Sequence, residues 1–269
     1  MTRIRAWRKI LVGGGVLLAA YAVFLLVLAP ATLLDVGLRH ATGGRLRLAL
    51  AQGTLWSGSG QVEVRDQAGR CGAGKAVAWS LQPLALWRGR LDFAVTVDHA
   101  AKAFPLQLSP RRIEVSDVDF SLPARVLGVA VPRLAPLDPQ GELVLHVAKF
   151  AVVGDVVTAD GVVTWKDASS AATAVAPLGT YELGFDGKDG PVRLTLRTLD
   201  GPLRLAGGGV WRGGAPPALT ITARVAPAQR AQLTPFLRLV AIERGDGDFA
   251  LQWNPRSGGA PTPTSPEKP

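Results

Sequence analysis

The sequence predicts a mainly β protein, in which a single N-terminal transmembrane helix precedes a large antiparallel β-sheet, β-sandwich or open β-groove with few short helices. Three observations predict this class. A long apolar segment follows a basic N-terminus, apolar and polar residues alternate in short runs along the body, and 31 glycines and 20 prolines supply turns between those runs. With 48% hydrophobic and 19% charged residues in a chain of 269, the composition excludes wholesale disorder.

The first thirty residues predict a membrane anchor. Residues 1–9 carry four basic and no acidic side chains, and Ile10–Ala29 contains no charged residue. Twenty helical residues span roughly 30 Å, which matches the hydrocarbon thickness of a bilayer. We therefore expect a cytoplasmic basic flank over 1–9 and a transmembrane helix over 10–30, with the remaining chain outside the cytoplasm. The alternative is a cleaved signal peptide with the small-x-small pattern Ala29-Pro30-Ala31, but cleavable apolar regions usually run only about 7–15 residues.

The body, residues 31–253, is predicted to be one β-rich domain. Alternating runs, each bounded by glycine or proline, occur at residues 60–65, 90–97, 142–147, 192–197, 219–225 and 247–253, and less fully at 45–50 and 161–165. Such runs are typical of half-buried antiparallel strands, and we expect about eight to twelve of them. Short helices are expected at 31–41, 122–128 and 228–240, the last kinked or split at Pro235. Residues 254–269 contain five prolines and are predicted to be a flexible tail.

Charge and cysteine content exclude several kinds of protein. Of the net charge of +9, four charges belong to the N-terminal flank, and the other basic residues are scattered, which argues against nucleic-acid binding. The single cysteine, Cys71, excludes an internal disulfide and a cysteine-based zinc site. The histidines His40, His99 and His146 have no paired carboxylate or cysteine in the sequence, and Asp117 and Asp119 are interpreted as surface residues. We expect no catalytic residues, no cofactor and no metal.

One segment comes close to a nucleotide-binding motif. Residues 69–76 have the phosphate-loop spacing of a glycine, four residues, then Gly-Lys, but Ala76 replaces the serine or threonine that holds magnesium. A strand-like segment follows where the motif needs a helix. We therefore interpret this segment as a glycine-rich hairpin turn, with Cys71 in it.

Six tryptophans in the body invite two interpretations. Exposed aromatic residues can mark a partner or sugar site, whereas buried ones anchor a sheet core. We favour core anchors because tryptophan is large and usually mostly buried. The six are Trp56, Trp79, Trp87, Trp165, Trp211 and Trp253.

Three segments together resemble the type II secretion system protein N family (GspN). They are the basic N-terminus with its apolar span, the segment Gly-Thr-Leu-Trp-Ser-Gly with the residues that follow it, and a late glycine-rich segment. The residues that carry the two later segments are Gly53, Thr54, Leu55, Trp56, Ser57, Gly58, Trp79, Pro83, Gly89, Gly201, Pro202, Leu203, Gly207 and Trp211. We interpret them as structural: glycine permits close backbone approach, and Trp56 is expected to fill the core.

The resemblance implies a bacterial inner-membrane protein with its N-terminus in the cytoplasm and its body in the periplasm. It further implies a role in the export of folded proteins across the outer membrane, with other type II secretion components as partners. The family brings no catalytic residues. We therefore expect a non-enzymatic, tethered scaffold or adaptor. The alternative is a lipid-handling envelope protein similar to the AsmA-like group, in which an open sheet with a continuous apolar face holds acyl chains; a filled, closed core would oppose it.

Overall fold

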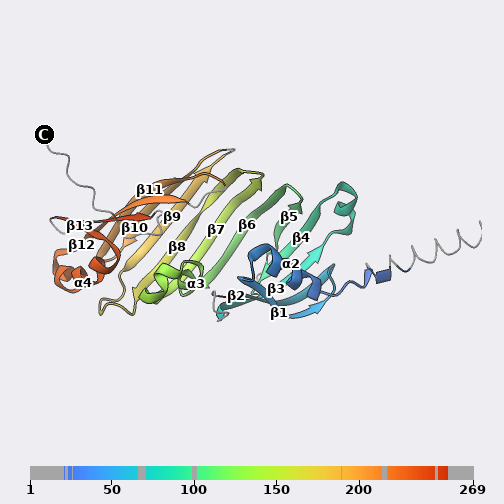
Figure 1. Ribbon diagram of the computed structural model, residues 1–269, viewed down its shortest axis with the longest axis horizontal. Helices are drawn as coiled ribbons and strands as arrows, with labels where there is room; N and C mark the ends of the chain where they lie inside the picture. The colour runs from blue at the N-terminus through green and yellow to red at the C-terminus, as the bar shows by residue number, and fades with distance from the viewer. Residues whose placement is uncertain are drawn as a thin grey trace, which may run out of the picture. The chain divides into compact units, whose positions relative to one another are not determined.

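The computed structural model describes residues 21, 24–25, 27–65, 71–98, 102–188, 190–213, 217–245 and 248–253 (Figure 1). The chain divides into two compact units, Met1–Ala103 (unit 1) and Phe104–Pro269 (unit 2). The predicted basic flank, most of the predicted transmembrane helix and the predicted tail lie outside the described residues. Within the described ranges, no helix is both long enough and apolar enough to cross a membrane.

Unit 1 contains a four-stranded antiparallel sheet in chain order. Its elements are α2 (Thr32–Thr42), β1 (Leu46–Gly53), β2 (Ser57–Arg65), β3 (Cys71–Leu81), the 3-10 helix η1 (Pro83–Arg88) and β4 (Leu91–Val97). Cross-strand pairs such as Trp79 with Val95 and Leu81 with Phe93 place apolar side chains on one face. Helix α2 confirms the short helix predicted at 31–41, and it contacts β1.

Unit 2 is an open antiparallel sheet that continues in chain order from β5 to β12 and ends with β14 and then β13. Its first elements are β5 (Phe104–Ser109), β6 (Arg112–Pro123), α3 (Val126–Ala130), η2 (Pro132–Leu137), β7 (Pro139–Val153), β8 (Val156–Ser170) and β9 (Gly179–Gly187). The later ones are β10 (Val192–Asp200), β11 (Leu203–Trp211), β12 (Ala218–Val225), η3 (Pro227–Gln229), α4 (Arg230–Val240), β13 (Ile242–Gly245) and β14 (Asp248–Trp253).

Each predicted alternating run coincides with a strand over its described residues, except that Arg45 and Arg90 precede β1 and β4, and three corrections concern other predictions. The described residues form fourteen strands rather than eight to twelve. The helix predicted at 122–128 is wrong at its start, because β6 continues to Pro123 and α3 begins only at Val126. Helix α4 is neither split nor ended at Pro235, which lies inside a continuous helix from Arg230 to Val240.

The two faces of the unit 2 sheet differ in chemistry. One face is apolar from strand to strand, as shown by pairs such as Phe120 with Leu145 and Leu194 with Phe185. The opposite face is charged: Arg197 pairs with Glu182 on the neighbouring strand, and Arg224 pairs with Asp248. This is the alternation expected of an antiparallel sheet with one buried and one solvated face.

Helix α4 covers one end of the apolar face. Because β6, β8, β10 and β12 run in the same direction, α3, the β8–β9 connection, the β10–β11 turn and α4 all lie at the same end of the strands (Figure 1). There Leu233 and Leu237 of α4 are almost fully buried in a cluster with Leu178, Leu203 and Phe249.

At the other end of the strands, the sheet curves so that apolar side chains of non-neighbouring strands meet. The rings of Phe150 on β7 and Trp211 on β11 stack with centroids 6.1 Å apart. In a flat sheet four strand spacings would separate them by roughly 19 Å, so the sheet is strongly curved there. The curvature buries Val157 and Val192 in a second cluster against these two rings. Both ends of the apolar face are therefore filled by the protein's own side chains.

Candidate functional site

The segment Gly53–Gly58, here called the β1–β2 turn, is a closely hydrogen-bonded loop. The Thr54 amide donates to the Ser57 carbonyl at 2.8 Å, and the Thr54 hydroxyl accepts the Trp56 and Ser57 amides at 3.3 Å. Gly53 has φ +90°, and a Cβ there would lie 2.5 Å from the Ser57 carbonyl oxygen, so only glycine fits. Gly53, Thr54 and Ser57 therefore act together to shape the backbone of this turn.

Trp79 of β3 lies beneath this turn. Its indole is 7% exposed, and its Nε1–H donates to the Thr54 carbonyl at 3.2 Å. A Cβ on Gly58 would lie 2.6 Å from the Trp79 ring, so glycine at this position makes room for the indole. Trp56, which was predicted to fill the core, is only half-buried, and Trp79 is the residue that fills it.

The β1–β2 turn also binds the chain that leaves the predicted membrane span. The Leu55 amide donates to the Ala29 carbonyl at 2.8 Å, and the Ala31 amide donates to the Gly53 carbonyl at 3.3 Å. Pro30 and Thr54 form an isolated antiparallel bridge. The turn therefore joins residues 29–31 to the sheet of unit 1.

A buried carboxylate that the sequence analysis missed blocks the edge of β1. Asp35 of α2 is 8% exposed, and its Oδ1 accepts the Leu48 amide at 2.9 Å. Its other oxygen pairs with Arg39 one helical turn later, at 3.0 Å. An acidic residue in a short helix gives no sequence signal for this role. The contact satisfies an edge amide that would otherwise be free to pair with another strand.

Pro83 and Gly89 begin and end η1. Pro83 is the first residue of the 3-10 helix, and Gly89 closes it in the left-handed conformation with φ +65°, its amide donating to the Leu86 carbonyl at 2.9 Å. Between them Leu84 is 81% exposed and Trp87 is 91% exposed. The prediction that Trp87 anchors the core is therefore wrong, because η1 projects its side chain into solvent.

The late residue set builds the β10–β11 turn of unit 2. Gly201 has φ +120°, and a Cβ there would lie 2.3 Å from the Cα of Gly179 on β9. The Leu203 amide donates to the Leu178 carbonyl at 3.1 Å, and the Pro202 carbonyl accepts the Ala226 amide at 2.9 Å. Leu203 itself is buried in the cluster under α4.

Gly207 and Trp211 belong to β11. A Cβ on Gly207 would lie 2.5 Å from the Thr220 carbonyl oxygen of β12, which shows how closely the two backbones approach. Trp211 stacks on Phe150 in the second cluster of unit 2. Nine of the fourteen predicted residues therefore lie in unit 1, at the β1–β2 turn, on β3 and at the ends of η1, and five lie in unit 2, where Leu203 and Trp211 are at opposite ends of β11.

The segments with possible catalytic chemistry do not assemble into a site. Gly74 and Lys75 lie within β3 rather than at a helix N-terminus, and Lys75 pairs with Asp98. Cys71 is the first residue of β3 and not part of a turn, which corrects the sequence interpretation. His146 does have a carboxylate partner, Asp119, directly opposite on the neighbouring strand, a pairing the sequence analysis missed.

Three further observations concern binding chemistry. The His146 and Asp119 side chains are both 66% exposed, so water screens this pair. No group of three or more histidine, cysteine or acidic residues suited to a metal ion occurs among the described residues. A polar pocket of about 500 Å³ beside the start of β7 is lined in part by Arg125, Asp138 and Gln140, and contains no paired nucleophile and base.

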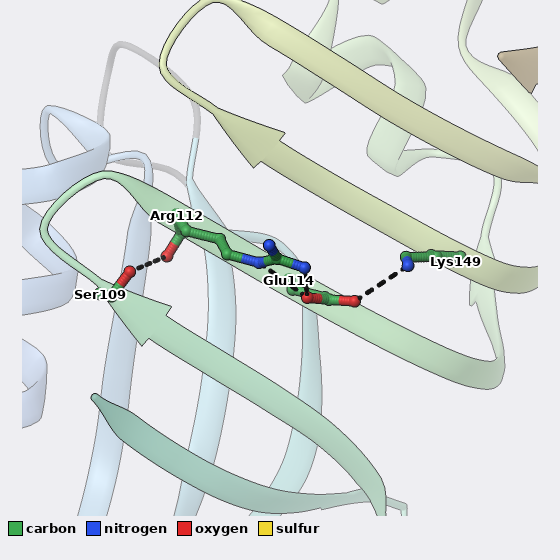
Figure 2. A network of polar contacts seen from close by, with 4 residues as sticks. All are labelled: Ser109, Arg112, Glu114 and Lys149. Carbon is green, nitrogen blue, oxygen red and sulfur yellow. Dashed lines mark hydrogen bonds and ion pairs between the residues drawn. The ribbon is translucent and has the colours of Figure 1, made fainter. Parts of the chain in front are cut away.

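An ion-pair network on β6 and β7 shows how the charged face is organised (Figure 2). The Arg112 guanidinium and the Lys149 ammonium both contact the Glu114 carboxylate, Lys149 at 3.3 Å, and Arg112 Nε donates to it at 2.9 Å. The hydrogen bond from Arg112 lowers the pKa of Glu114 below its ordinary value, against a smaller opposing effect of burial. All three side chains lie on the charged face of the sheet, so the network links β6 and β7 at the protein surface.

One comparison with known proteins identifies the family of the chain. The family model of the type II secretion system (T2SS), protein N, matches residues 44–252, which include both turns described above. Comparisons with curated proteins and with solved structures give no match.

Proposed function

The chain belongs to the type II secretion system protein N family, and on that premise we propose that it serves type II secretion as a non-enzymatic, membrane-tethered adaptor. The match over residues 44–252 is the observation that carries this proposal, because it spans most of both units. In the proposal, residues 10–30 cross the bacterial inner membrane, and the two units lie in the periplasm, where they contact other secretion components.

The tether is supported by the exposure of its last residues. Leu28 donates its amide to the Phe24 carbonyl at 3.0 Å, as in a helix. The large apolar side chains in this stretch are more than half exposed to solvent: Tyr21, Phe24, Leu25, Val27 and Leu28. Apolar side chains of a helix gain free energy when lipid replaces the surrounding water. A bilayer supplies that environment.

The adaptor role is supported by the two kinds of sheet edge. The β1 edge is blocked by Pro30 and by Asp35, so another strand cannot add there without displacing them. β13 forms the final strand of the described unit 2 sheet, and its Ile242 side chain is 51% exposed. An exposed edge strand can pair with an extended segment of a partner. We therefore assign β13 as the docking edge.

The lipid-handling alternative gains no support from the described residues. An acyl-chain groove needs an apolar face that the protein itself leaves empty. In unit 2 that face is filled at one end by Leu233 and Leu237 of α4, and at the other by Phe150 and Trp211. The proposed function is accordingly that of a protein-contacting component.

A secretion assay tests the proposal. In a strain that lacks this chain, we expect export of type II substrates to fall, and expression of the full chain to restore it. Cross-linking in intact cells followed by purification from membranes is expected to recover other type II secretion components. Normal export in the deletion strain, together with recovery of no secretion component, would overturn the proposed function.

The docking edge has its own matched pair of variants. Ile242→Lys places a charge on the edge strand and is expected to reduce cross-linking to the partner without unfolding the sheet. Val210→Lys is the control, because Val210 is 42% exposed on β11, an interior strand. Equal loss of cross-linking in both variants would show that the edge is not the docking surface.

A further inference from the structure

Helix η1 exposes apolar surface to an unusual degree. Single exposed apolar residues are common on soluble proteins. Here, however, Trp87 at 91% and Leu84 at 81% are the two most exposed large apolar side chains among the described residues, and Leu86 between them is also exposed. Three such residues within four positions make a concentrated apolar projection, which marks an interaction surface.

The backbone of η1 is ordered by hydrogen bonds on both sides. The Gln82 amide donates to the Asp92 carbonyl at 2.9 Å before the helix begins, and the Arg90 amide donates to the Ala85 carbonyl at 3.2 Å after it. Ala85 is 7% exposed and turns inward. The backbone of η1 therefore holds these apolar side chains outward before any contact forms. This preorganisation lowers the entropic cost of binding them to another surface.

The position of η1 in unit 1 connects it to the predicted membrane span. The Leu55 amide binds the Ala29 carbonyl at the end of the span, and the next residue, Trp56, accepts the Leu81 amide at 2.6 Å. η1 begins two residues after Leu81. Two strand spacings and a few residues give a path of about 20 Å from Ala29 to Pro83. A surface this close to the end of a span lies within reach of the lipid headgroups.

The charge next to the apolar side chains favours a lipid surface over a protein pocket. Arg88 follows Trp87 directly, is exposed, and has no ion-pair partner among the described residues. Tryptophan is enriched at membrane interfaces, and arginine beside it is attracted to anionic headgroups. We propose that η1 is a second membrane contact, in which Leu84 and Trp87 enter the lipid interface while Arg88 meets anionic headgroups.

This inference rests on the proposed tether only for the placement of η1 near the bilayer. It adds an orientation: a span and a second contact together restrict how unit 1 turns above the membrane. A second, smaller feature agrees with it, since Leu33 and Val36 of α2, the helix that follows the span, are also more than half exposed.

Fluorescence quenching by lipid tests the proposal on the full chain. The protein is reconstituted into vesicles of phosphatidylethanolamine and phosphatidylglycerol, with or without brominated acyl chains. Subtracting the emission of Trp87→Phe from that of the unchanged protein isolates Trp87 from the six other tryptophans. We expect brominated lipid to quench most of this difference, and replacement of phosphatidylglycerol by phosphatidylcholine, or Arg88→Gln, to reduce the quenching.

Trp165→Phe provides the matched control. Trp165 is half-buried on β8 of unit 2, and its Nε1–H donates to the Gln140 carbonyl at 2.9 Å. The Trp165 difference emission should be the same with both lipids. Because Trp87 is exposed, Trp87→Phe should keep the melting temperature of the unchanged protein, so a lost signal cannot be assigned to unfolding.

The outcomes separate this proposal from the proposed function. Trp87 emission that brominated lipid leaves unchanged overturns the inference, and if Trp87→Ala also abolishes export, η1 binds a protein instead. Release of the protein from vesicles by alkaline carbonate would overturn the tether but not the η1 contact, which is read from quenching before the wash. A protein that fails to associate with vesicles at all overturns both.

Discussion

Units 1 and 2 both contain antiparallel sheets, but they differ in how far their most exposed large apolar side chains are open to solvent. In unit 2, two clusters fill the apolar face, and residues such as Leu233 and Val192 are completely buried. Unit 1 contains the three most exposed large apolar side chains among the described residues, which are Leu50, Leu84 and Trp87. Since burying apolar surface is the main stabilising contribution to folding, unit 2 satisfies this need within itself.

The two units also differ in the surface that each presents to other molecules. Unit 1 has a packed core that includes Trp79, Leu81 and Phe93, and hydrogen bonds around the β1–β2 turn and from Leu48 to Asp35 add to it. It also presents apolar surface next to the predicted membrane span. Unit 2 is stabilised by packing and presents charged groups and one sheet edge.

The largest effect is expected from truncating the packed helix of unit 2. Leu233→Ala removes a fully buried side chain and leaves a cavity, so the free energy of unfolding should fall by about 2–5 kcal/mol. The matched change in unit 1, Leu84→Ala, removes a side chain that is 81% exposed and should change it by less than about 0.5 kcal/mol. Urea unfolding followed by circular dichroism measures both. Similar losses for the two variants would show that η1 packs against protein and contradict the contrast.

The next largest loss of stability is expected at two glycines, one in each unit, that have positive φ and lie against neighbouring backbone. Gly53→Ala and Gly201→Ala each force a Cβ to within about 2.5 Å of backbone atoms at positive φ. We expect each to cost roughly 3 kcal/mol, the sum of left-handed strain and a displaced backbone. Gly89→Ala is the control, because its φ is also positive but the space around it is open, and it should cost only about 1–2 kcal/mol. Equal costs at all three positions would show that close approach contributes nothing.

Much of the fold could be predicted from the sequence, because alternation of apolar and polar residues reports directly on a sheet with one buried face. The strand that escaped prediction most clearly is β11. Its consecutive residues Gly207, Gly208 and Gly209 remove the alternating pattern, although close approach to β12 requires glycine at two of them. Curvature was also beyond prediction, because the contact between Phe150 and Trp211 joins strands that are not neighbours.

The roles of single residues were harder to predict than the strands. The size of tryptophan favoured burial for all six in the body. Trp79 is indeed buried, whereas Trp87 is exposed. The deciding factor is the 3-10 geometry of η1, which turns Ala85 inward and leaves its larger neighbours outside. The role of Asp35 depends on a hydrogen bond to a residue thirteen positions away, and no local pattern encodes it.

A smaller effect is expected at the polar group buried beside the β10–β11 turn of unit 2. Tyr181 is 4% exposed, and its hydroxyl donates to the Leu203 carbonyl at 3.0 Å. Tyr181→Phe removes that hydrogen bond and should lower the free energy of unfolding by about 1 kcal/mol at neutral pH. Unit 1 offers no equivalent phenol among its described core residues, so the change should affect unit 2 alone.

The same residue predicts how unit 2 responds to alkali. Burial raises the pKa of Tyr181 above its ordinary value of 10, because the phenolate would lose its hydration. A raised pKa in the folded state means that the stabilising contribution is complete below pH 10 and is lost as the pH rises further. Unfolding measured above pH 10 should therefore show a steeper loss of stability in the unchanged protein than in Tyr181→Phe. Parallel curves would contradict the burial of the hydroxyl.

The smallest effect is expected on the charged face, where the Arg112 and Lys149 side chains that pair with Glu114 are about half exposed to water. Arg112 lowers the pKa of Glu114 below its ordinary value of 4.5, so the contribution of this carboxylate is present above pH 4.5 and is lost as the pH falls through its folded value. Glu114→Gln should change stability by about 0.5 kcal/mol or less near neutral pH, and the difference should shrink in high salt. Acid unfolding of the two proteins at low and high salt measures this. A large, salt-independent loss would mean that the charged face of unit 2 contributes to its core stability, and that packing of the apolar face alone does not hold the unit together.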